Sequence, residues 1–129
     1  RCLPMNNGAD PIDSFLSEKT RILESAIRQV LEHIAERESL RDEMVAQINN
    51  QQCDAKGRLY RVAPYGDAPL TIGDPRRRSA IEKELTDLEA EKRREMVSAW
   101  KDISTLRKEL RERFIEYLEE RQRQRVLQP

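Results

Sequence analysis

The chain has 129 residues, of which 37% are charged and only 5% aromatic, and its formal net charge is zero. An ordinary globular domain has about 25% charged residues, so this chain has few large side chains with which to build a closed core. The composition favours long helices that pack along narrow apolar seams instead. Because acidic and basic residues balance, no overall electric field directs the chain to nucleic acid or to an anionic membrane.

The first predicted element is a helix over residues 10 to 52, preceded by a flexible N-terminus at residues 1 to 9. Asp10 is a suitable N-cap, and Pro11 suits the first helical position, where its missing N–H costs nothing. Downstream, seven of ten heptad seam positions are apolar: Leu16, Leu23, Ile27, Val30, Ile34, Met44 and Ile48. The exceptions include Arg37 and Arg41, so we expect the packing to change near residue 38.

A connector over residues 53 to 74 follows, rich in glycine and proline. The segments RLYRV (58 to 62) and LTI (70 to 72) predict two short strands, and the APYGDAP segment between them predicts the loop of a β-hairpin. A turn between antiparallel helices needs only about two to eight residues, so this connector is longer than chain reversal requires. Exposed strand edges are pairing surfaces. We therefore expect a partner-binding tip formed by Leu59, Tyr60, Val62, Leu70 and Ile72.

The second predicted helix covers residues 75 to 127 and begins like the first, with Asp74 followed by Pro75. Its seam residues are Ile81, Leu85 and Leu88, then, after a shift at Lys92 and Glu95, Met96, Ala99, Ile103, Leu106, Leu110 and Tyr117. Glu-to-Arg pairs four residues apart, such as Glu109 and Arg113, support the helix.

These elements predict a mainly all-α fold: a long antiparallel helical hairpin or coiled coil with a small β-hairpin connector, forming one elongated unit. If residue 52 lies level with residue 75, residues 118 to 127 overhang the first helix. Several apolar residues fall outside the seam of the second helix and widen its apolar face. We expect them to form an oligomer interface, most simply that of a homodimer in a helical bundle; the interface comprises Trp100, Phe114, Ile115 and Leu118.

No residue pattern points to chemistry. His33 is the only histidine and has no Ser, Cys or paired carboxylate placed with it. Cys2 and Cys53 are far apart, no Glu-x-x-His motif occurs, and the glycines fit no phosphate-binding loop. We expect a protein that is not an enzyme and has no catalytic residue, cofactor or metal site.

The basic triplet Arg76, Arg77 and Arg78 lies at the start of the second helix, where it could contact an anion or nucleic acid. No aromatic residues are interleaved with it, and stacking aromatics are typical of single-strand binding. Nucleic-acid binding is therefore not the favoured prediction.

No apolar run approaches the roughly 20 residues of a membrane span, so we expect no membrane partner and a cytoplasmic protein, or a viral one assembled in the cytoplasm. In length and in its layout of helix, short β-hairpin and helix, the chain resembles a β-type prefoldin subunit. That resemblance implies a molecular chaperone. The leading hypothesis is a non-catalytic coiled-coil scaffold or adaptor that self-associates and binds an unknown protein partner through its tip; a prefoldin-like chaperone and a nucleic-acid-binding or packaging subunit are the alternatives.

Overall fold

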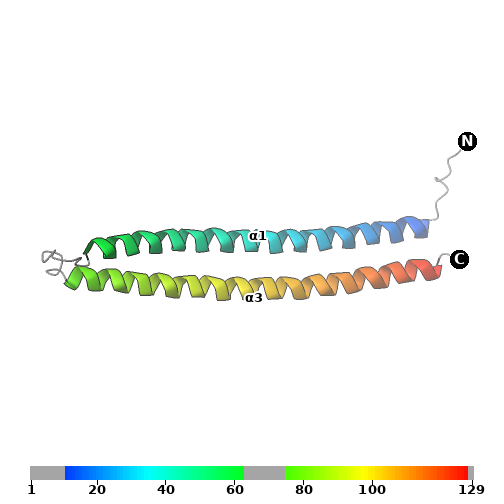
Figure 1. The fold of residues 1–129 in the computed structure, drawn as a ribbon. Helices are drawn as coiled ribbons and strands as arrows, with labels where there is room; N and C mark the ends of the chain where they lie inside the picture. The colour runs from blue at the N-terminus through cyan, green and yellow to red at the C-terminus, as the bar shows by residue number, and fades with distance from the viewer. Residues whose placement is uncertain (1–10, 63–74, 128–129) are drawn as a thin grey trace, which may run out of the picture. The chain divides into compact units, whose positions relative to one another are not determined.

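The computed structural model describes residues 11–62 and 75–127, with side chains from residue 18 to 61 and from 75 to 127. Within these ranges the chain forms two long helices, α1 (Pro11–Val62) and α3 (Pro75–Leu127), which pack against each other (Figure 1). The prediction of a mainly helical hairpin is confirmed. Contacts divide the chain into a middle unit, Arg37–Asp102, and a terminal unit, Arg1–Glu36 with Ile103–Pro129.

Local sequence explains why both segments are helical. Each helix begins at a proline, which is favourable at the first helical position. On the surface of α3, Lys83 pairs with Asp87 at 2.9 Å and Arg113 with Glu109 at 3.7 Å, both four residues apart. Such pairs stabilise a helix by about 0.2 to 0.5 kcal/mol each. Packing against the other helix therefore supplies most of the stability.

In the middle unit, α1 and α3 run antiparallel along a narrow seam. Their direction follows from polar contacts across the seam, because Arg58 pairs with Glu84, whereas Asn49, earlier in α1, accepts from Lys92, later in α3. Beside the Arg58–Glu84 pair, Ala55 and Ile81 form a buried cluster, against which Leu59 and Leu85 pack. Among the described residues of this unit, the buried apolar ones are Ile48, Ala55, Ile81, Leu88 and Ala99.

The terminal unit repeats the same construction. Ile27, Val30 and Ile103 are buried. Near the unit's far end Lys19 lies 3.4 Å from Glu120, and Gln124 donates a hydrogen bond to the Thr20 hydroxyl. In this unit too, the two helices pack along a narrow seam of apolar residues, with polar side chains among them.

The structure corrects the prediction for the first strand of the connector. Residues 58 to 62, expected to form a strand, belong to α1, and no strand occurs in the described ranges. The helix continues past Gly57 because Ala55 and Leu59, one turn apart, both reach the core, and because Arg58 pairs with Glu84. Tertiary packing thus overrides the local β-type alternation. The second expected strand, with Leu70 and Ile72, lies outside the described residues.

The longer α1 also shifts the register. Gln52 lies against Glu89, where residue 75 had been expected. The predicted overhang of residues 118 to 127 is wrong, since Glu120 and Gln124 both contact α1.

The predicted change of packing near residue 38 is not seen in the exposure pattern of α1. Ile34, Arg37, Arg41 and Met44 are all half-buried and keep the alternating steps of three and four residues. On α3, in contrast, Glu95, Ala99 and Ile103 are buried at two successive steps of four residues. Two consecutive steps of four interrupt a heptad repeat and locally unwind a supercoil. The seam therefore passes through Glu95, and the expectation that Met96 lies in it is wrong, because Met96 is exposed.

Candidate assembly surface

In the middle unit, three large apolar side chains of α3 point away from the seam. Trp100 is 68% exposed, and Met96 and Val97 are about half exposed, whereas their neighbour Ala99 is fully buried against α1. On this stretch of helix the smallest apolar residue faces inward and the largest faces outward. We call Met96, Val97 and Trp100 the tryptophan patch.

Basic residues surround the tryptophan patch. Arg93, Arg94 and Lys101 are exposed, and together with Val97 and Ser98 they line an open surface pocket on α3. The nearby acidic residue Glu91 lines a different groove, with Asn50 and Arg58 at the interface with α1. The patch is therefore an apolar area with a positive border.

The terminal unit carries a second exposed apolar area on α3, formed by Phe114, Ile115 and Leu118, of which Leu118 is 61% exposed. We call it the phenylalanine patch. Exposed Glu112 and Glu119 lie beside it. Its border carries both charges, because Arg111, one turn before Phe114 and Ile115, is exposed as well.

Arg121 lies near the phenylalanine patch but is held by Tyr117. Its guanidinium is 5.9 Å from the centre of the Tyr117 ring and donates to the Tyr117 hydroxyl at 3.1 Å. Arg113, also nearby, pairs with Glu109 and Glu116. These contacts engage two of the arginines that lie around the phenylalanine patch.

All four residues predicted for the oligomer interface, Trp100, Phe114, Ile115 and Leu118, are exposed, and the structure divides them between the two patches. Met96 had been assigned to the seam. The sequence would have shown that Met96 is exposed only if Glu95 had been placed in the seam. Glutamate is seldom buried, so that placement was not expected.

Polar residues in the seam itself form close pairs rather than a reactive site. Arg37 donates to Glu95 and to Asp102, each at 2.8 Å, and these hydrogen bonds raise the pKa of its guanidinium. Gln52 donates to Glu89 at 2.9 Å, and this bond, reinforced by the charge of Lys92, lowers the pKa of Glu89. Charges paired in this way fix how two helices align.

Glu120 is the most deeply buried charged side chain of the described region, with 1% of its surface exposed. Its Oε1 lies 2.9 Å from Arg123 and 3.4 Å from Lys19, while Oε2 has no hydrogen-bond partner. Sequence reasoning did not single it out. The clue was its spacing of three residues from the seam position Tyr117.

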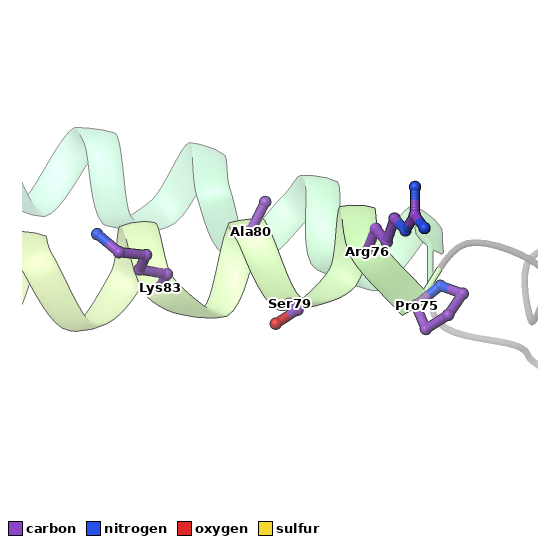
Figure 2. A pocket seen from close by; sticks show the side chains of 5 residues that line it. All are labelled: Pro75, Arg76, Ser79, Ala80 and Lys83. Atoms are coloured by element: carbon purple, nitrogen blue, oxygen red, sulfur yellow. The ribbon is translucent and has the colours of Figure 1, made fainter.

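The basic triplet Arg76, Arg77 and Arg78 lies exposed in the first turn of α3. A shallow pocket nearby is lined by Pro75, Arg76, Ser79, Ala80 and Lys83. Figure 2 shows that all five side chains come from this one helix. No residue of α1 lines it, so the pocket is a groove on the surface of a single helix. It lacks the converging polar groups of a ligand site.

Of the predicted binding tip, the structure describes the side chains of Leu59 and Tyr60. Leu59 packs against the Ala55–Ile81 cluster, so it belongs to the core. Tyr60 is 67% exposed. Val62 is the last residue of α1.

Among the described residues, no group of three His, Cys, Asp or Glu side chains is arranged to hold a metal ion. Cys53 and His33 are both exposed. Neither described helix contains an apolar stretch of the length and character that a membrane crossing requires.

Comparison with known proteins gave no match to a family model, to a curated protein or to a solved structure.

Proposed function

We propose that this protein is a non-catalytic assembly protein, a helical hairpin that self-associates through the outer face of α3 and serves as a scaffold or adaptor in a larger complex. The observation that carries the proposal is the placement of Trp100, 68% exposed beside the fully buried Ala99. A hairpin that functioned alone would be more stable with the tryptophan facing α1 and the alanine facing water, since burial of apolar surface stabilises by roughly 25 cal/mol per Å².

Tryptophan is also among the residues that contribute most to protein–protein binding. Met96 and Val97 enlarge the apolar area around it, and Arg93, Arg94 and Lys101 provide a polar rim. A central aromatic residue inside a polar rim is the usual layout of an interface.

A scaffold also needs a surface for its other partner. We assign this role to the connector end of the molecule, where Tyr60 is exposed in the last turns of α1. Leu59 is left out of the proposed surface, because it packs in the core.

Light scattering coupled to gel filtration tests the proposal on the full chain and on a Trp100→Ser variant. We expect the wild type at tens of micromolar to have a mass above that of one chain, and the variant to shift toward a single chain. Tyr60→Ser is the matched control, because Tyr60 is as exposed as Trp100 but lies outside the patch. A wild type that remains a single chain would refute self-association.

A further inference from the structure

One face of the middle unit carries the tryptophan patch beside a stretch of α1. Gln52 donates to Glu89 across the seam, and this hydrogen bond marks the face on both helices. On α3, Met96 and Trp100 follow Glu89 by seven and eleven residues, close to two and three turns, so they lie on its side of the helix. On α1, Val45 precedes Gln52 by seven residues and lies on the side of Gln52.

The two helices of this face differ in charge. On α3, Arg93 is exposed one turn before the tryptophan patch. On α1, Asp42 lies one turn before Val45, and 71% of its side chain is exposed although it pairs with its neighbour Arg41. Glu38 lies one turn before Asp42. We call Glu38, Asp42 and Val45 the acidic stretch.

The acidic stretch and the tryptophan patch lie level with each other in one hairpin. Lys92 donates to Asn49, and Arg37 donates to Asp102. The acidic stretch lies between these two contacts on α1, and the tryptophan patch lies between them on α3. All of these residues belong to the middle unit.

Two copies can join through this face around a twofold axis in two ways. An axis across the helices sets α3 on α3, so the two tryptophan patches meet and bring Arg93 and Arg94 of both copies together. Like charges held together across an interface disfavour binding. An axis along the helices sets α3 of each copy on α1 of the other, so each tryptophan patch meets an acidic stretch and the charges attract.

We propose that this protein forms a twofold dimer in which the tryptophan patch of each copy docks onto the acidic stretch of the other. This inference rests on the self-association proposed above and specifies how it occurs. Symmetry sets the register, because a shift along the twofold axis would produce an open chain of copies instead of a closed dimer. The two stretches that lie level within one copy therefore also lie level between copies.

The apolar side chains of the face are covered in the same arrangement. Met96 and Trp100 of one copy pack toward Val45 of the other, which removes apolar surface from water at two equivalent places. The four helices then form a bundle in which each helix runs antiparallel to its neighbours.

Charge reversal with mixing tests the dimer on the full chain, using sedimentation velocity. Arg93→Glu sets a third carboxylate against Asp42 and Glu38 of the second copy, and Asp42→Arg sets a new cation against Arg93. We expect each single variant to self-associate about tenfold more weakly than the wild type. In a mixture of the two variants the introduced charges face each other, so mixed dimers should form with wild-type affinity.

The Arg93→Glu variant also separates the two symmetric arrangements. With α3 on α3, it would remove a cation from a crowded basic border and would strengthen self-association instead. Both substituted positions are exposed, and circular dichroism checks that each variant keeps its helix content. Arg28→Glu, an exposed reversal elsewhere on α1, is the control and should associate like the wild type.

The outcomes distinguish this inference from the function on which it rests. If the wild type self-associates but Arg93→Glu associates as strongly or more strongly, or if mixing fails to restore association, the docking of α3 on α1 is wrong while the proposed function stands. If the wild type is a single chain, both proposals fail.

Discussion

Arg37 of α1 and Glu95 of α3 are joined across the seam by a 2.8 Å hydrogen bond from the guanidinium Nη1 to the carboxylate Oε2. Only 14% of the Arg37 side chain and 9% of the Glu95 side chain are exposed. Buried charges are tolerated when they are paired, and the penalty for separating them opposes any sliding of the helices. This pair lies where α3 interrupts the heptad repeat, so it marks one alignment of α1 with α3.

Removing Arg37 alone should destabilise the hairpin more than removing the whole pair. In Arg37→Leu, the Glu95 carboxylate stays buried without its main donor, so the midpoint of urea unfolding should fall. In Arg37→Leu combined with Glu95→Leu, no charge is stranded, and stability should return to at least the wild-type level. A double variant less stable than Arg37→Leu would contradict this account of the seam.

The apolar cluster around Ala55 and Ile81 should contribute strongly to stability. Ile81→Ala leaves a cavity beside Ala55 and should cost about 2 to 5 kcal/mol in the free energy of unfolding. Ile22→Ala is the matched control; Ile22 is 60% exposed, and its change should lie within about 0.5 kcal/mol of the wild type. Equal effects of the two substitutions in chemical denaturation would show that the seam is placed incorrectly.

Stability should depend on pH through Glu89. The hydrogen bond from Gln52 and the charge of Lys92 lower the pKa of Glu89 from its ordinary value of 4.5. The unfolded chain therefore takes up this proton more readily, so the stabilising contribution is fully present above pH 4.5 and is lost as the pH falls through the folded-state pKa. Gln52→Met should raise the pKa of Glu89, which carbon-detected NMR titration measures. An unchanged titration would show that the Gln52 bond is absent in solution.

The extension of α1 through residue 62 can be tested at Arg58. Its guanidinium meets both carboxylate oxygens of Glu84, at 2.6 and 3.3 Å. Arg58→Glu should lower the melting temperature, because it places two carboxylates together. Adding Glu84→Arg should recover most of the loss. If the second substitution gave no recovery, residue 58 would not lie opposite residue 84.

The sequence predicted the two helices and their packing as a hairpin, because apolar spacing and the two proline starts are local properties. It failed at residues 58 to 62, where Leu59 fits a strand by alternation and a helix by its four-residue step from Ala55. Only contact with Ile81 on the other helix decides between them. Glu95 was missed as a seam residue, and Glu120 went unnoticed, for the same reason, since a buried carboxylate becomes favourable only through a partner distant in sequence.

The most direct test of the assembly surface uses Trp100, which is the only tryptophan of the chain and therefore the sole source of indole fluorescence. In one isolated hairpin it is 68% exposed to water. We predict that at high protein concentration its emission is blue-shifted and protected from acrylamide quenching, and that dilution moves the emission to longer wavelength as copies separate. Emission typical of a water-exposed indole at every concentration, while light scattering still reports an oligomer, would contradict the placement of the interface on the outer face of α3.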